Sequence, residues 1–113
     1  MTLDLQAVRQ TAETIALQAA DTLMTYHRQG FQQEAKDGAF DMVTEADKAA
    51  EALIVDALTE AYPDHHIVGE EGGGTGAPIA GATYRWYVDP LDGTTNFVNG
   101  IPLFAVSLAL TDA

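Results

Sequence analysis

Apolar residues recur at intervals of three and four over residues 3–29, at Leu5, Val8, Ala12, Ile15, Ala16, Ala19, Leu23 and Met24. This spacing predicts one face of an amphipathic helix. Gly30 is expected to end that helix, because glycine commonly follows a helix C-terminus. From Gln32 to Phe40 the pattern is broken and polar, with a turn signal at Asp37-Gly38, so a loop or a short hairpin is predicted there.

A second helix is predicted to begin at Thr44. The string Thr44-Glu45-Ala46-Asp47 resembles a capping box in which Asp replaces the usual Glu or Gln. Helical spacing then continues through Ala46, Ala50, Leu53, Ile54, Ala57, Leu58 and Ala61, and Pro63 should end the helix.

The remaining pattern predicts strands. Ile67-Val68 is a short apolar piece, and the Gly-, Ala- and Pro-rich residues 72–81 predict a mobile loop. The aromatic and β-branched residues 84–88 predict a strand with Trp86 and Tyr87 in the core. Residues 104–110 are nearly all apolar, as in a buried strand with neighbours on both edges. We therefore expect an α+β fold with two long helices on a mainly antiparallel sheet.

Composition narrows the class of protein. The 113 residues are enough for one small domain, and the 47% of hydrophobic residues suit a globular core. The lack of cysteine excludes disulfides and fits the cytoplasm. No apolar run approaches the roughly 18 residues of a membrane span. A net charge of −12 argues against a nucleic-acid partner. It reflects either a solvated surface or carboxylates that converge on cations.

The string Asp89-Pro90-Leu91-Asp92-Gly93-Thr94-Thr95 carries the clearest chemistry. Pro90 fixes φ and lacks an N–H, so we expect the strand to end there. The turn would then aim both carboxylates at one point, with the Leu91 carbonyl between them. Such hard oxygens suit Mg²⁺. A plain Asp-Gly turn after a strand is the alternative reading.

The second half of the same string suits a phosphate. Gly93 allows the backbone to approach a ligand closely. Thr94 or Thr95 is expected to cap a short helix, whose free N–H groups would form a phosphate cradle.

Two further segments add carboxylates. Gly69-Glu70-Glu71-Gly72 follows a short strand, where paired carboxylates either complete a metal site or form an acidic loop. Asp47, placed in the first turn of the second helix, either stabilises the helix N-terminus or orients a water. Lys36 either offsets the carboxylates or lies on the surface.

The three histidines predict no functional site. His65 and His66 would point to opposite sides of an extended segment, so they predict no joint zinc site. His27 lies near a helix C-terminus, where positive charge is favourable, and nothing more is assigned to it.

Three blocks together resemble the inositol monophosphatase family. Residues 41–47, residues 68–71 and residues 86–98 match the family's blocks in order and spacing, and the apolar residues 104–110 follow where the family has a strand. The resemblance implies that residues 1–113 are the N-terminal, metal-binding portion of the layered αβαβα sugar-phosphatase fold, shared with fructose bisphosphatases. The C-terminal half, with the family's Trp-Asp-x-x-Gly block, is absent from the sequence.

The resemblance also implies roles for the residues. Glu70, Asp89 and the Leu91 carbonyl would hold a first Mg²⁺, and Asp89 would bridge to a second ion on Asp92. The catalytic set it implies is Asp47, Glu70 and Thr94, with Asp47 and Thr94 orienting the attacking water. The substrate-binding set it implies is Glu70, Leu91, Asp92, Gly93 and Thr94.

The implied activity is the Mg²⁺-dependent, lithium-sensitive hydrolysis of a small phosphorylated polyol or sugar, with myo-inositol monophosphate as the first candidate. Histidinol phosphate, fructose bisphosphate and nucleotide phosphates are alternatives. Because the block that completes the second metal site is absent, a non-catalytic metal-binding or dimerising fragment is also expected as an alternative. The family resemblance also allows a homodimer.

Overall fold

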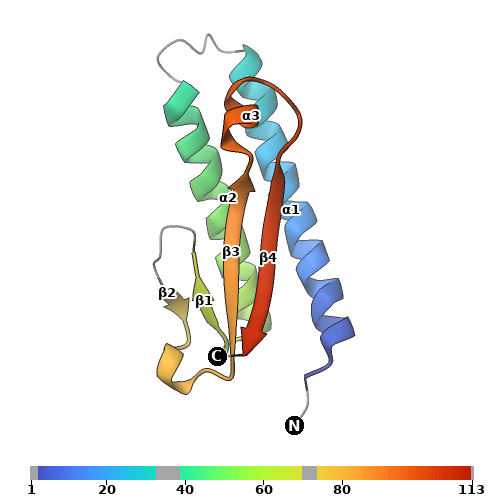
Figure 1. The fold of residues 1–113 in the computed structure, drawn as a ribbon, viewed down its shortest axis with the longest axis vertical. Coiled ribbons are helices and arrows are strands. Elements are labelled where there is room, and N and C mark those ends of the chain that lie inside the picture. The colour runs from blue at the N-terminus through green and yellow to red at the C-terminus, as the bar shows by residue number, and fades with distance from the viewer. Residues whose placement is uncertain (1–2, 33–38, 70–73, 113) are drawn as a thin grey trace.

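A computed structural model describes residues 3–32, 39–69 and 74–112. Two long helices lie on one side of a small sheet (Figure 1). A short third helix lies at one end of the sheet, between the two longest strands. The elements follow the order α1, α2, β1, β2, a 3₁₀ turn, β3, α3 and β4. The fold is α+β, as the sequence predicted.

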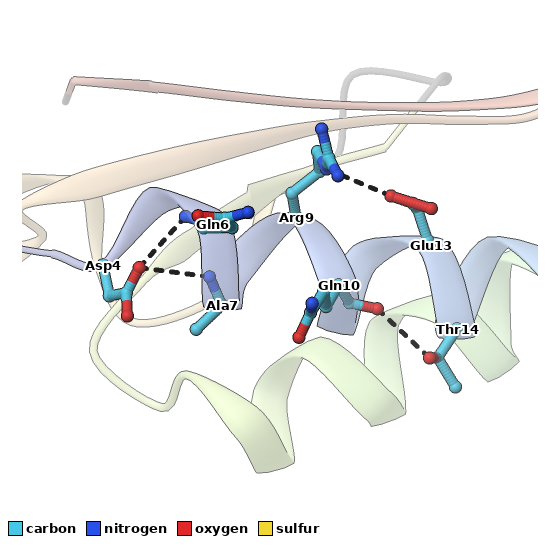
Figure 2. A network of polar contacts seen from close by, with 7 residues as sticks. All are labelled: Asp4, Gln6, Ala7, Arg9, Gln10, Glu13 and Thr14. Carbon is cyan, nitrogen blue, oxygen red and sulfur yellow. Dashed lines mark hydrogen bonds and ion pairs between the residues drawn. The ribbon is translucent and has the colours of Figure 1, made fainter.

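Helix α1 spans Leu5–Gln32. Asp4 begins it, because its Oδ1 accepts the backbone N–H groups of Gln6 and Ala7 at 3.1 and 3.2 Å (Figure 2). One turn later, Arg9 and Glu13 form an exposed ion pair at 3.2 Å. The prediction that Gly30 ends this helix is wrong, since the helix continues for two more residues.

Helix α2 spans Ala39–Ala61. It begins five residues before the predicted Thr44, so Thr44 is not its N-cap; its end two residues before Pro63 is confirmed. Every fourth residue from Ala46 to Leu58 on α2 is fully buried, namely Ala46, Ala50, Ile54 and Leu58. These meet a matching row on α1, Val8, Ile15, Ala19 and Leu23. None of the helices in the described ranges is long and apolar enough to cross a membrane.

The sheet has four strands in the order β2-β1-β3-β4: β1 is His66–Val68, β2 is Gly74–Gly76, β3 is Tyr84–Asp92 and β4 is Ala105–Asp112. β1 pairs antiparallel with β2 and parallel with β3, and β3 pairs antiparallel with β4. Two of these three pairings are antiparallel, so the sheet is mixed. The loop predicted at 72–81 contains β2 and a 3₁₀ turn at Ile79–Gly81.

The two long strands, β3 and β4, alternate between a helix-facing side and an open side. Trp86 and Val88 are 2% and 3% exposed, and they pair with Leu110 and Leu108 of β4. Tyr87, between them, is 41% exposed, so its predicted core position is wrong. β4 was predicted to be buried between two neighbours. Among the described strands it pairs only with β3, and its inward residues are half-buried.

Candidate functional site

The motif that starts at Asp89 lies at the end of β3, where the ladder to β4 is irregular. Asp89 pairs with Ser107 and Asp92 pairs with Ala105, so Pro90 and Leu91 lie opposite the single residue Val106. This is a β-bulge, one of the few places where a sheet accepts proline. The prediction that the strand ends at Pro90 is therefore wrong: the bulge absorbs the missing N–H and β3 continues to Asp92.

The bulge orients the backbone between the two carboxylates. The Leu91 N–H donates to Asp89 Oδ1 at 3.3 Å, which is a local turn closed by an aspartate side chain. Pro90 and Leu91 are buried, whereas Asp89 is half-buried and Asp92 is exposed. The apolar residues thus fix the end of the strand while both carboxylates retain contact with solvent.

The strand passes into α3, Thr94–Val98, through a glycine in the left-handed region. Gly93 has φ 98° and ψ 40° and forms the N-cap, without a side-chain hydrogen bond. Capping by Thr94 or Thr95 was therefore a wrong prediction, since both lie inside the helix. A Cβ on Gly93 would lie 3.0 Å from the Leu103 carbonyl oxygen and 3.1 Å from Phe104 Cα. The site needs glycine here for both its conformation and its close packing.

The segment after α3 folds back and secures this turn. Asn96 Nδ2 donates to the Leu103 carbonyl at 2.8 Å, and the Ile101 N–H donates to the Asn96 carbonyl at 2.8 Å. These bonds fix the chain that packs against Gly93. The Asp89–Thr94 turn is therefore bounded by the bulge on one side and by this returning segment on the other.

Helix α2 carries two further carboxylates, those of Asp47 and Glu51. It packs against both β3 and α3. Asp47 lies on α2 and its Oδ1 is buried. Because α2 begins at Ala39, Asp47 is two turns into the helix, and the predicted role at the helix N-terminus is wrong.

The end of β1 adds a contact that the sequence did not predict. A Cβ on Gly69 would lie 2.9 Å from Glu51 Oε2, so the Glu51 carboxylate occupies the space beside this glycine. Glu51 follows Asp47 by four residues, a spacing that places both on one helix face and was available in the sequence. β1 and β3 run parallel with Val68 opposite Tyr87, so Gly69 leaves β1 beside the stretch of β3 that leads to Asp89. Glu70, Glu71 and Lys36 lie outside the described residues.

The donor set suits a hard cation in its chemistry. Asp89, Asp92 and the Leu91 carbonyl come from one turn, and carboxylate and carbonyl oxygens are the ligands that Mg²⁺ takes. Within the described ranges, no three His, Cys, Asp or Glu side chains gather closely enough to hold a metal ion. The turn provides two of the predicted carboxylates, and the third, Glu70, is outside those ranges.

His65 and His66 contact different segments. Trp86 Nε1 donates to His65 Nδ1 at 3.0 Å, while His66 Nδ1 lies 2.7 Å from the Ala77 carbonyl oxygen. Burial lowers the pKa of His65 from its ordinary value, and the nearby Asp64 carboxylate opposes this shift. His65 therefore belongs to an aromatic cluster at the far end of β3, with Tyr62 stacked on its ring at 4.9 Å.

The sequence is similar to those of known proteins. A profile of the inositol monophosphatase family matches residues 4–113. Nus factor SuhB of Pseudomonas aeruginosa is 61% identical over 71 residues, which cover 63% of this chain and 26% of that protein. Fructose-1,6-bisphosphatase/inositol-1-monophosphatase of Aquifex aeolicus is 48% identical over 73 residues, which cover 65% of this chain and 26% of that protein.

A solved structure shows the same fold. The inositol monophosphatase from Anabaena superposes with a TM-score of 0.76 at 34% identity, over 97% of this chain and 37% of that one. The chain thus spans less than half the length of the relatives it matches. Because the family profile covers nearly every residue and the fold agrees, this chain belongs to the inositol monophosphatase family.

Proposed function

We propose that this chain provides the magnesium-binding part of a phosphatase that hydrolyses small phosphate monoesters, with myo-inositol monophosphate as the first candidate substrate. The observation that carries the proposal is the turn at the end of β3. There, a bulge, a left-handed glycine and a short helix follow one another within ten residues, and two carboxylates flank a backbone carbonyl.

Each candidate site residue has its own role in this proposal. Asp89, Asp92, Glu70 and the Leu91 carbonyl would hold Mg²⁺. Once bound, Mg²⁺ would supply charge neutralisation and a more acidic water. Asp47 and Thr94 would orient that water by accepting its hydrogens. The Gly93 and Thr94 backbone N–H groups would meet the phosphate, since positioning is the main demand of phosphoryl transfer.

The substrate class is supported by the carboxylates and the backbone of the Asp89–Thr94 turn and by the name of one relative. The Aquifex aeolicus relative is named for both fructose bisphosphate and inositol monophosphate. Fructose bisphosphate is therefore the second candidate, ahead of histidinol phosphate and nucleotide phosphates. We place this activity in the cytoplasm, in agreement with the absence of cysteine from the sequence.

A phosphate-release assay tests the proposal. The chain is incubated with myo-inositol 1-phosphate while Mg²⁺ is titrated. The variants Asp47→Asn and Thr94→Ala are compared with Glu45→Gln, which changes an exposed residue on the helix that carries Asp47. We expect Mg²⁺-dependent release that falls at least about tenfold in the first two variants and not in the third. Release that ignores Mg²⁺, or that is equal in all variants, would contradict the proposal.

The second candidate is a non-catalytic role. Its support is that several of the relatives are named Nus factors. In that case the chain binds Mg²⁺ or a second copy of itself without releasing phosphate. Mg²⁺ binding without turnover in the assay above would favour this candidate.

A further inference from the structure

A buried histidine on α1 contacts the segment that encloses the candidate site. His27 is 7% exposed and lies inside α1, five residues before its end. Its ring is 5.2 Å from that of Phe97 in an edge-to-face arrangement and 5.3 Å from that of Phe104. The two phenylalanine rings are themselves 5.0 Å apart and edge-to-face. We name these three residues the His27 cluster.

The His27 cluster joins three elements around the turn. Phe97 belongs to α3, which follows Gly93, and Phe104 precedes β4. Figure 1 shows α3 beside the upper part of α1. The contact between the His27 and Phe97 rings joins these two helices. No contact of His27 with the carboxylates is needed, because the cluster acts on the chain that carries them.

Phe104 connects the histidine to the turn. Its Cα and Cβ lie 3.1 and 3.2 Å from the position that a Cβ on Gly93 would take. The ring that contacts His27 thus belongs to the residue whose backbone packs against Gly93. A shift of that ring that also moves the Phe104 backbone would displace the wall that confines Gly93 at φ 98°.

We infer that His27 is a positioning residue for the Asp89–Thr94 turn, acting through Phe104 and Phe97. The importance of that turn rests on the proposed function, but the positioning itself does not. Aromatic pairs prefer defined edge-to-face geometries. An aromatic ring at position 27 should therefore hold the turn, whereas an aliphatic side chain of similar bulk should fill the space without fixing the angle.

Amide hydrogen exchange measures the turn directly, without a metal or a substrate. The informative amides are those hydrogen-bonded around α3, at Phe97, Asn99, Gly100 and Ile101. The variants are His27→Leu, His27→Phe and, as a matched control in the aromatic cluster at the other end of β3, Tyr62→Leu. Global stability of each variant is measured by urea unfolding, so that local opening is separated from global opening.

His27→Leu should speed exchange of these four amides about tenfold or more beyond its effect on global unfolding. His27→Phe should restore them to within about threefold of the original protein, and Tyr62→Leu should leave them at the rate set by global stability. Equal exchange in His27→Leu and Tyr62→Leu at matched stability would overturn the inference, as would failure of His27→Phe to restore protection.

A Mg²⁺ titration of the same variants separates this inference from the proposed function. If the original protein binds Mg²⁺, His27→Leu should weaken binding and His27→Phe should restore it. If the original protein binds none, the proposed function fails, while the exchange rates still decide the role of His27.

Discussion

The two ends of strand β3 have different roles in the molecule. At the Tyr84 end the ladder is regular, and Trp86 is buried, hydrogen-bonded to His65 and stacked near Tyr62 at 6.1 Å. At the Asp92 end the ladder bulges, and the carboxylates reach solvent. One end stabilises the fold and the other presents charged groups. The comparison teaches that regular pairing marks the stabilising end, while an irregular backbone with solvent-accessible carboxylates marks the candidate site.

The largest expected loss of stability follows from a substitution at the stabilising end of β3. Trp86→Ala should lower the free energy of unfolding by about 3–5 kcal/mol, because it leaves a cavity under the sheet and removes the donor to His65. Tyr87→Ala, next to it on the open side, should cost under about 1 kcal/mol. Urea unfolding followed by far-UV circular dichroism measures both. Equal losses would show that the two sides of β3 do not differ as described.

The next effect is at the site end. Gly93→Ala should cost about 2 kcal/mol, because the left-handed backbone disfavours a side chain and the new Cβ meets the Leu103 carbonyl. The matched control is Gly81→Ala, where a Cβ meets no atom within 4 Å. The control should be nearly neutral in the same unfolding experiment. A neutral Gly93→Ala would mean that the turn relaxes freely and is not confined by Leu103 and Phe104.

The smallest stability effect is a pH dependence at the stabilising end. Burial lowers the folded-state pKa of His65, so the unfolded chain binds the proton more tightly. The contribution is complete above the ordinary value of 6.5 and is lost as the pH falls from there toward the lowered pKa. Protonation also removes the acceptor of the Trp86 hydrogen bond, worth about 1 kcal/mol.

Trp86 is the single tryptophan, so its fluorescence reports this end of the strand during urea unfolding at different pH values. The control is His65→Gln, which cannot titrate, and its stability should vary less between pH 7 and pH 5. An unchanged pH dependence in that variant would assign the effect to other groups.

Sequence periodicity was sufficient for the two long helices and for the strands β1, β3 and β4, but not for their ends or for the short strand β2. The apolar rows of α1 and α2 follow helical spacing closely, so both helices were predicted. Their boundaries were wrong at Gly30 and Thr44, since local glycine and capping signals yield to helix packing. The predicted end of β3 at Pro90 was also wrong. Proline ends a strand in a regular ladder, but the ladder here has a bulge at Pro90.

The candidate site was also predictable only in part. The motif placed Asp89, Leu91, Asp92 and Gly93 in one turn, because neighbours in sequence remain neighbours in space. Contacts between distant segments were not predictable from one sequence. His27 against Phe104 and Glu51 against Gly69 join residues far apart in the chain, and only the packing of helices on the sheet brings them together.

The central claim is that the exposed end of β3 binds Mg²⁺, and calorimetric titration of the chain with MgCl₂ tests it most directly. We expect binding that weakens about tenfold or more in Asp89→Asn and Asp92→Asn. Binding should be unchanged in Glu13→Gln, an exposed carboxylate on α1. Asp92→Asn should unfold within about 0.5 kcal/mol of the original protein, because the side chain is exposed. Absence of Mg²⁺ binding, or equal binding in all three variants, would contradict the account.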